Sequence, residues 1–498
     1  MGANAAIETA AEFINALMDL KAFRQGSLSG LTCDEITAVF KRVEAARITR
    51  ANFTISSSHD FQALNSHENF LLATLVWKVL MPLAGKHNFF RDLSARTVGA
   101  SRLKHLDPPP RPHALPYDHE LPARPLDIVP RRVAWGVFSC AMSFLFYTAN
   151  SAMNVSPDEL TSWGELGLLD RNWLGATGAN DVLKMLTSLL SFSVLASDIT
   201  PRVQLIYLLS QLLSPILVFT VEGYRIGRHG SSISIPIIFT TGLQVLGLCK
   251  TMPLFALLSA LQSDQNPVDR AVPTHVARSL VPALVLGFVI PTILMLTPIP
   301  DQSIWQDWTA LWQVAPPLVS VLVVVFSSAL VWWRGHKGDR YPTSVSDRER
   351  HPEWYSTDDV PTLKTTYLFA SATQASAHLA TLAYVFSHQD LSFSALFWDL
   401  PNPFRHEWNL ATLSDKIFVI FKFDLLLGFA AIAAHNLYSV WELRRQGYIA
   451  TSTATMAAFA VTLGQVFLGS GATWAILWSW REDVMAGLSV LGEGKTSR

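Results

Sequence analysis

Ionisable side chains lie within one long apolar run of the sequence. The run Ile417–Tyr438 carries Asp424 and His435, and on a helix these two share a face with Gly428 and Ala431, because the spacing is i, i+4, i+7 and i+11. Ionisable groups in apolar segments are costly and often line a cavity that serves function. The alternative is that each group only hydrogen-bonds a neighbouring helix.

A second acid ends a polar stripe on an earlier apolar run. The face recurs at helical steps of three, four or seven and consists of Gln204, Gln211, Ser214, Val218, Glu222 and Arg225, of which all but Val218 are polar. It indicates a polar helix face that ends in a Glu/Arg pair. The alternative for Glu222 and Arg225 is a solvated ion pair at a helix end.

A third polar face lies on a run that has no charged residue. Its members are Ser371, Gln374, His378 and Thr381. Four polar groups on one face favour a lined cavity, although a lone histidine more often makes a helix–helix hydrogen bond. Gln244 and Gln465, on other runs, would extend this face.

These residue types suggest acid catalysis in an apolar pocket. A carboxylic acid shielded from water stays protonated and can open an epoxide or protonate an olefin. We expect Asp424 or Glu222 to be the general acid and His435 or His378 to orient it or relay the proton. Gln374 or Arg225 would support the acid by hydrogen bonding. Aromatic faces would shield a cationic intermediate, and the candidates are Phe421, Phe423, Trp474 and Trp478.

The motifs of diphosphate chemistry are missing from the sequence. A membrane prenyltransferase or a class I terpene synthase holds magnesium with aspartate-rich motifs, and no DDxxD or NDxxD occurs here. HExxH, GxSxG, P-loop and haem motifs are absent too. We therefore predict no metal site and no cofactor.

Composition defines the class of protein. Half of the 498 residues are hydrophobic, only 15% are charged, and the mean hydropathy is +0.27. Such a balance is typical of a polytopic membrane protein. The net charge of −1 gives no indication of a nucleic-acid partner. The three cysteines are far apart and resemble neither a disulfide framework nor a metal site.

The first part of the chain differs from the rest. Residues 1–105 have no secretory signal peptide pattern, and Thr32 with Glu35 predicts a capping box at the start of an amphipathic helix. We interpret this region as small, helical and cytosolic. Within it, Phe70–Ala84 is too short for an easy crossing and is predicted to be buried or interfacial. Residues 106–130 contain eight prolines and predict an extended linker.

Residues 131–480 are predicted to form the transmembrane domain, followed by a tail at 481–498. About nine candidate spans follow from length and apolarity, with eight remaining possible. They are Val133–Ala149, Val182–Ala196, Val203–Val221, Ile233–Leu248, Leu280–Leu296, Thr309–Trp333, Thr365–Phe386, Ile417–Tyr438 and Thr455–Trp478. The predicted fold is an all-α polytopic helical membrane bundle with a small N-terminal cytosolic helical region.

The distribution of basic residues predicts an orientation with the linker in the cytosol. Arg131 and Arg132 precede the first span, and Arg444 and Arg445 also fall inside. One connection disobeys the rule, because residues 223–230, GYRIGRHG, would face outward. Either a span is miscounted there, or these cations serve a purpose that outweighs the topological bias.

Two stretches resemble a known family. They are TVEGYRIGRHGSSISIPIIF at Thr220–Phe239 and LSDKIFVIFKFDLLLGFAAIAAHNLYSVWELRRQGYI at Leu413–Ile449. Both are similar to fungal integral-membrane terpene cyclases of meroterpenoid biosynthesis, above all those of the ascofuranone and ascochlorin pathways. The resemblance covers the chain from the proline-rich linker to Trp480.

The resemblance implies a metal-independent cyclase of secondary metabolism. Its substrate would be a hydrophobic prenylated aromatic compound with an epoxidised farnesyl chain, and acidic residues would protonate the epoxide. The partners would be the lipid bilayer of the endoplasmic reticulum and other membrane enzymes of the pathway. Two other classes remain open: a proton- or metabolite-coupled transporter, for which intramembrane acids are equally natural, and a non-catalytic membrane scaffold.

Overall fold

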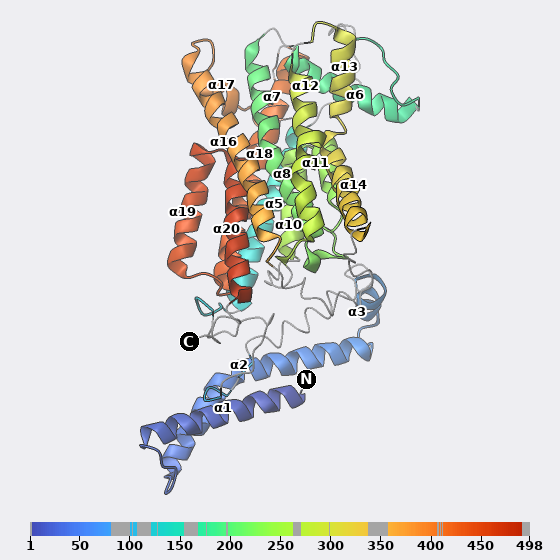
Figure 1. The fold of residues 1–498 in the computed structure, drawn as a ribbon. Coiled ribbons are helices and arrows are strands. Elements are labelled where there is room, and N and C mark those ends of the chain that lie inside the picture. Colours follow the sequence, from blue (N-terminus) through green and yellow to red (C-terminus); the bar gives the residue numbers. More distant parts are fainter. Residues whose placement is uncertain are drawn as a thin grey trace. The chain divides into compact units, whose positions relative to one another are not determined.

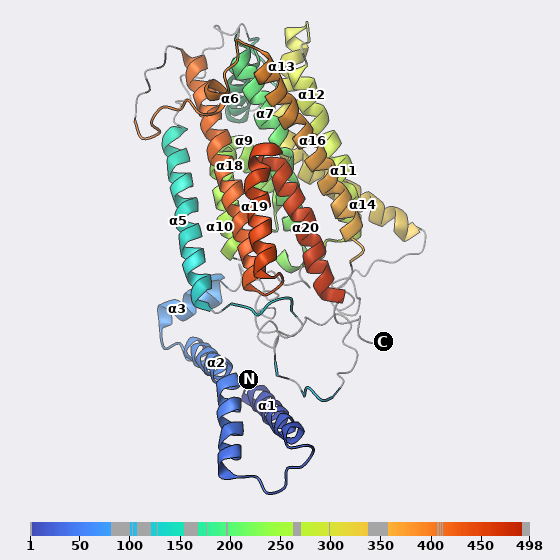
Figure 2. The same cartoon turned by 90° about the vertical axis from the view of Figure 1, so that its left-hand side faces the viewer.

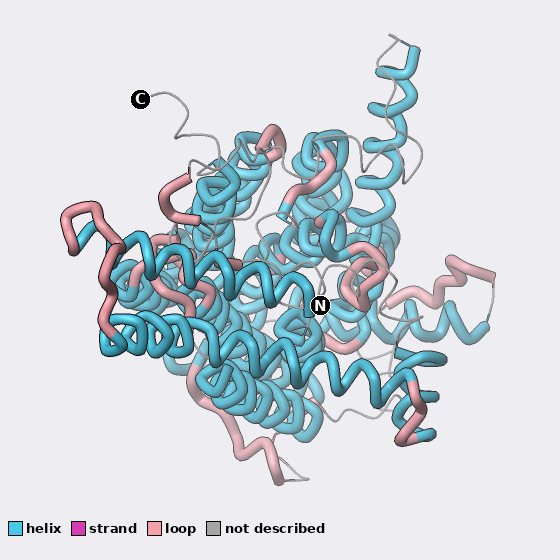
Figure 3. The backbone as a smooth tube through the Cα atoms, turned by 90° about the horizontal axis from the view of Figure 1, so that it is seen from below, coloured by secondary structure: helices cyan, strands magenta, loops and turns pink. Residues whose placement is uncertain are grey.

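In the computed structural model, the part of the chain that it describes consists of helices joined by loops and turns (Figures 1 and 3). This part comprises residues 2–80, 100–101, 103–106, 121–126, 128–153, 168–175, 177–195, 198–261, 270–297, 299–336, 357–405, 408, 410 and 412–490. No strand occurs among these residues, which confirms the predicted all-α class. The chain separates into two compact units, residues 1–121 with 489–498 and residues 122–488.

The helices of the first unit are α1 (Gly2–Phe23), α2 (Cys33–Asn65) and α3 (Phe70–Leu75), which continues into a π-helical turn at Val76–Leu80. The helices of the second unit up to residue 296 are α5 (Ile128–Ala152), α6 (Thr177–Val194), α7 (Ile199–Gln211), α8 (Leu213–Tyr224), α9 (Pro236–Val245), α10 (Leu248–Leu261), α11 (Thr274–Leu284) and α12 (Ile290–Leu296). Those that follow are α13 (Gln302–Trp312), α14 (Ala315–His336), α16 (Val360–Ser387), α17 (Phe393–Phe397), α18 (Leu413–Arg445), α19 (Thr451–Phe467) and α20 (Ser470–Val490).

The first unit is a pair of packed helices, α1 and α2. The predicted capping box starts α2, since the Glu35 N–H donates to Thr32 Oγ1 at 3.3 Å and the Thr32 N–H donates to Glu35 Oε2 at 2.8 Å. Val39 and Val43 are buried between the helices, whereas Phe40 is exposed and stacks on Phe13. The core of this unit is therefore small.

The run Phe70–Ala84 is described only as far as Leu80. Phe70 and Leu71 are 69% and 79% exposed, so the first turn of this run is not buried within the protein, and the alternative of an interfacial position stays a prediction. The remainder of the predicted run, and most of the proline-rich linker, lie outside the described residues.

Five described helices are long and apolar enough to cross a membrane, judged by length and composition. They are Pro130–Ala152, Ile199–Tyr224, Thr274–Leu296, Ala315–Trp333 and Leu413–Arg445. Each coincides with one of the nine predicted spans. The count of eight or nine spans stays a prediction.

The last predicted span, Thr455–Trp478, is wrong as a single helix. Helix α19 ends at Phe467, Gly469 has a φ of +87°, and α20 begins at Ser470. Glycine adopts this left-handed conformation without the steric cost that a Cβ would add. The two helices lie side by side as a hairpin, and their turn lies part-way along α18 (Figure 2).

Further predicted spans are also divided, among them Val203–Val221, in which α7 ends at Gln211 and α8 begins at Leu213. Thr309–Trp333 consists of α13 and α14, which meet at a turn around Gln313. Ile233–Leu248 consists of α9 and the first residue of α10, with Gly247 between them at a φ of +78°. Hydropathy alone did not reveal these breaks, because the residues on both sides are equally apolar.

The end of the linker packs against the end of α18. The Ala123 N–H donates to the Gly447 carbonyl oxygen at 3.1 Å, and the Leu126 N–H donates to the Arg445 carbonyl oxygen at 2.7 Å. Gly447 has a φ of +81°, and a Cβ there would run into the carbonyl oxygen of Ala123. A glycine is therefore needed at this junction for both conformation and space.

Replacing Gly447→Ala should lower the free energy of unfolding by about 1–3 kcal/mol, because alanine is strained at a positive φ. Thermal unfolding of the detergent-purified chain measures this. The control is Gly136→Ala on α5, where a Cβ would meet nothing within 4 Å. Equal midpoints for both variants would contradict the packing described here.

Candidate active site

Six aromatic rings gather in the interior of the second unit. We call them the aromatic cluster: Phe219 (α8), Phe239 (α9), Phe255 (α10), His435 (α18), Trp474 and Trp478 (α20). The His435 ring lies 5.3 Å from Trp478 and 5.7 Å from Trp474, measured between centroids. Such rings present negative π-faces that stabilise a nearby cation.

Glu222 lies at the edge of the aromatic cluster, near the end of α8. Its Oε1 accepts hydrogen bonds from Trp478 Nε1 at 2.9 Å, Arg225 Nε at 2.8 Å and Arg481 Nη1 at 3.2 Å. Glu222 and Arg225 are 1% and 3% exposed, so the alternative of a solvated ion pair is wrong. Arg225 therefore hydrogen-bonds a buried carboxylate, and its role in supporting an acid stays a prediction.

Arg225 belongs to a larger set of buried charges. We call this set the ionic network: Glu222, Arg225, Arg270, Asp359, Arg481 and Glu482, none more than 4% exposed. Arg225 pairs with Glu482, and Arg270 contacts Glu482 Oε2 at 3.1 Å and Asp359 Oδ1 at 2.8 Å. The network joins the C-terminal end of α8, the N-terminal end of α16 and the middle of α20 to the segment before α11.

Most members of the ionic network could not be found from sequence periodicity. Glu482 lies 257 residues from Arg225 and 212 from Arg270, so no local spacing relates them. The tail was predicted to begin at residue 481, whereas α20 continues to Val490. The available signal was the charged triplet Arg481–Asp483 directly after an apolar run.

The charges of the network compensate one another. Burial by itself raises the pKa of Glu482, but the guanidinium groups of Arg225 and Arg270 outweigh burial and hold that pKa below its ordinary value. Glu482 therefore remains ionised at neutral pH. Removing one member would leave a buried charge without compensation, which is the costly case.

His435 is the imidazole of the aromatic cluster. It is 2% exposed, and its Nδ1 has no hydrogen-bond partner among the described residues. The same holds for Nε1 of Trp474. Buried polar atoms normally have partners, so two unpaired atoms in adjacent rings are notable. They are the atoms through which this cluster can hydrogen-bond a polar group.

Asp424 has a different environment from the one expected. Its Oδ1 accepts the N–H of Cys249 at 2.8 Å, at the start of α10, where the first N–H groups of a helix lack partners within that helix. A Cβ on Gly428 would lie 2.6 Å from the Leu248 side chain, so the face between Asp424 and His435 packs against α10. Eleven residues separate the two along α18, about 16 Å. Asp424 therefore does not share a site with His435.

The third polar face lies against the turn between α19 and α20. His378 Nε2 donates to the carbonyl oxygen of Val466 at 3.0 Å, so Nδ1 accepts from the hydroxyl of Tyr207 at 2.9 Å in the neutral ring. Both ring nitrogens are thus engaged, which is the alternative of a satisfied helix–helix bond. His378 does not join the aromatic cluster.

Gln374 supports a helix break rather than an acid. Pro215 has no N–H, so it leaves the carbonyl oxygen of Gln211 without its partner in the helix. Gln374 Nε2 donates to that oxygen at 2.8 Å, and its Oε1 accepts from Ser214.

Of the remaining candidates for substrate binding, Trp474 belongs to the aromatic cluster. Phe421 does not belong to it. It lies on α18 close to Asp424 and is 8% exposed. Fourteen residues separate Phe421 from His435, about 20 Å along the helix. The structure therefore brings Glu222, Arg225, His435 and Trp474 together, and it separates Asp424, His378, Gln374 and Phe421 from them.

The fold and the site define an all-α protein whose apolar interior holds a carboxylate and an imidazole beside aromatic rings. This is an arrangement suited to proton transfer and to the stabilisation of a cation. The chain belongs to the CtvD domain family, whose model matches residues 135–486. The match includes both stretches that carry the predicted resemblance.

The relatives bear two kinds of name. Two are FAD-dependent monooxygenases, verC1 of Penicillium polonicum and atnA of Arthrinium sp, at 23% and 24% identity over 97% of this chain. The chain spans only 58% and 55% of their lengths. The third is the terpene cyclase ctvD of Aspergillus terreus, 32% identical over 138 residues, 26% of this chain and 40% of that protein. No solved structure matches.

The family and the Aspergillus relative support the predicted resemblance to fungal terpene cyclases at the level of the family. The particular likeness to the ascofuranone and ascochlorin pathways is not addressed by these comparisons and stays a prediction.

The role of Asp424 can be tested by two substitutions. Asp424→Asn keeps an oxygen that accepts the Cys249 N–H, so stability and activity should remain close to those of the parent. Asp424→Leu leaves that N–H without its acceptor and should cost about 1–3 kcal/mol of unfolding free energy. Thermal unfolding and turnover of an epoxyfarnesyl phenol are both measured for each variant and for the parent protein. A stable Asp424→Asn protein without activity would restore Asp424 as the acid.

The ionic network can be tested with adjacent residues of α20. Glu482→Gln should lower the free energy of unfolding by about 3–5 kcal/mol, because Arg225 and Arg270 lose a buried partner. The control is Asp483→Asn, whose ion pair with Lys364 is 2.6 Å long and half exposed. That change should cost less than about 1 kcal/mol. Similar unfolding midpoints for the two variants would contradict a structural role for the network.

Proposed function

We propose that this chain is a membrane-bound terpene cyclase that opens an epoxide on a prenylated aromatic substrate and closes a ring without metal. The observation that carries the proposal is the Glu222 carboxylate, bonded to the indole N–H of Trp478 at the edge of the aromatic cluster. Membership of the CtvD domain family and the name of the Aspergillus relative support the same class of reaction.

In this proposal His435 holds the proton as an imidazolium, while Glu222, which accepts hydrogen bonds from Trp478, Arg225 and Arg481, stays a carboxylate. Proton transfer to the epoxide oxygen breaks a C–O bond, and the olefin attacks the carbon that becomes positive. The faces of Trp474 and Phe255 stabilise this charge, and the Glu222 carboxylate balances it. The proton lost in the final step returns to His435, so the product is an isomer of the substrate.

Trp478 links His435 to Glu222. Its ring contacts His435, while its Nε1 holds the Glu222 carboxylate. Arg225 and Arg481 hold that carboxylate from other directions, so its position is determined before substrate binds. Preorganised charges of this kind cost no reorganisation during the reaction.

The location and the supply of substrate follow from the same proposal. The long apolar helices support a membrane location, and we propose the membrane of the endoplasmic reticulum, as the resemblance to the fungal cyclases implies. The relatives named FAD-dependent monooxygenases extend well beyond the part that this chain covers. We propose that a flavin-dependent monooxygenase forms the epoxide on which this chain acts.

A monooxygenase activity of this chain itself is the less favoured assignment. Nucleotide cofactors such as FAD are commonly bound on a parallel sheet flanked by helices. The described residues form helices only. The part of the relatives that this chain does not span is where we place their oxygenase activity.

The transporter hypothesis is supported by one observation. The interruption between α7 and α8 contacts the turn between α19 and α20, where the N–H of Gly471 donates to Gln211 Oε1 at 3.0 Å. Interrupted helices that meet inside a bundle occur at ion and substrate sites of transporters. Incubating the purified chain with an epoxyfarnesyl phenol, without ATP or a gradient, distinguishes a cyclase from a transporter, since a transporter forms no product.

Glu222→Gln should reduce turnover of an epoxyfarnesyl phenol by roughly 100-fold or more, the usual contribution of a preorganised electrostatic group. His435→Ala should have a similar effect, the usual contribution of an acid–base group. The matched control is Glu442→Gln, which removes a buried carboxylate from another i, i+3 pair with an arginine, Arg445. Cyclised product is measured by mass spectrometry in microsomes.

Loss of fold must be distinguished from loss of chemistry. Trp478→Phe keeps an aromatic ring, although a smaller one than the indole, and removes the N–H that holds Glu222, so it should fold and lose roughly tenfold in turnover, the value of one hydrogen bond in the transition state. Full activity in both Glu222→Gln and Trp478→Phe would show that Glu222 and Trp478 are not part of the active site.

A further inference from the structure

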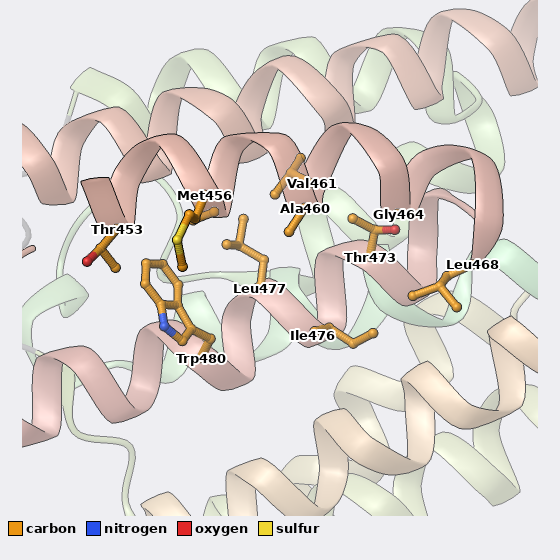
Figure 4. A pocket seen from close by; sticks show the side chains of 11 residues that line it. Thr453, Met456, Ala460, Val461, Gly464, Leu468, Thr473, Ile476, Leu477 and Trp480 are labelled. Carbon is orange, nitrogen blue, oxygen red and sulfur yellow. The ribbon is translucent and has the colours of Figure 1, made fainter. Parts of the chain in front are cut away.

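A pocket lies between the two helices of the α19–α20 hairpin. Its volume is about 410 Å³, within the usual range for sites that hold organic ligands (Figure 4). Its wall contains Met456, Ala460, Val461, Ile476 and Leu477, and no charged side chain is part of it. The pocket is therefore suited to an uncharged, apolar ligand.

The pocket has a polar end and an apolar end. Thr453 and Trp480 lie close together at one end, and Leu468 lies at the other (Figure 4). The indole N–H of Trp480 and the hydroxyl of Thr453 can bond a polar headgroup. From Thr453 to Leu468 the pocket follows about 22 Å of helix α19. A molecule with a polar ring and a long isoprenoid chain matches this division.

Helix α20 connects the pocket to the aromatic cluster. Thr473 and Leu477 line the pocket, whereas their neighbours Trp474 and Trp478 belong to the cluster on the opposite face of the helix. Both tryptophans are at most 2% exposed, so a substrate cannot reach the cluster without passing between helices. At the hairpin, an apolar pocket is therefore separated from the cluster by a single helix.

The hairpin is open on its outer side. Met456 and Ile476 are 70% and 46% exposed, although both are apolar. A hydrophobic substrate is concentrated in a bilayer, and it would reach these side chains laterally. Gly464 packs against Thr473 near the turn, and a Cβ there would lie 2.6 Å from Thr473 Oγ1, so this seam closes the pocket at one end.

We propose that the pocket between α19 and α20 binds the isoprenoid chain of the substrate before it enters the aromatic cluster. This inference rests on the proposed function, because it identifies the ligand as the prenylated substrate. A membrane phospholipid, which also combines a polar end with an apolar chain, is the other occupant that the test must exclude.

The test fills the pocket from α19. Ala460→Trp places an indole among the lining residues, and Ala458→Trp adds the same group to the same helix outside the pocket. The first variant should raise KM for an epoxyfarnesyl phenol about tenfold with kcat little changed, because it removes ground-state binding. The control should leave both constants unchanged.

Binding is measured separately with a farnesyl phenol that carries a diazirine. Irradiation of the detergent-purified protein should label peptides containing Met456 and Trp480, and labelling should fall about fivefold in Ala460→Trp but not in Ala458→Trp, in proportion to occupancy. Excess phosphatidylcholine should not compete. Competition by phosphatidylcholine, or equal labelling in the two variants, would overturn the proposal.

The two readouts distinguish failure of the pocket from failure of the proposed function. Turnover with equal KM in both tryptophan variants would leave the cyclase intact and reject the pocket. Pocket-specific labelling without any turnover would leave the pocket as an isoprenoid site and reject the cyclase.

Discussion

The arrangement of the second unit depends on the buried pairing of three carboxylates with arginines. Each ion costs several kcal/mol to remove from water, so these charges are tolerated only where partners meet them in good geometry. Arg225 and Arg270 both form ion pairs with Glu482, and Arg270 forms a second ion pair with Asp359. The chain can satisfy these groups only if α8, α16, α20 and the segment before α11 come together. This requirement also determines the direction of the Glu222 carboxylate, and through Trp478 it positions the edge of the aromatic cluster.

The sequence predicts those parts of this arrangement that lie within a single helix. Helical spacing places Glu222 and Arg225 on one face, and it places Asp424 and His435 together on α18, as found. Spacing along one helix does not reveal what lies opposite. The small residues between Asp424 and His435 are compatible with a cavity or with close packing. The structure shows close packing, because α10 lies against this face. The partners of Arg225 lie too far along the chain for any periodicity to indicate them.

The breaks in helices were also beyond a hydropathy analysis, for a definite physical reason. Apolar residues on both sides of Gly469 and Gly247 make one continuous run, while the backbone turns at a single left-handed glycine. The interruption at Pro215 is similar, because its cost is offset by a side chain on another helix, Gln374, which satisfies the freed carbonyl. Fold class could thus be predicted from composition, whereas the hairpin of α19 and α20, and the pocket within it, could not.

The distance in sequence between the partners of the ionic network has a consequence for biosynthesis. Proteins are synthesised from the N-terminus, and earlier segments begin to fold first. Arg225 and Arg270 are made more than 200 residues before Glu482, so the growing bundle contains these cations well before their shared carboxylate exists. Assembly of the bundle is therefore completed by α20. A chain truncated before this helix would retain uncompensated arginines in an apolar interior, and such a product is a natural target for the quality control that removes unfinished proteins.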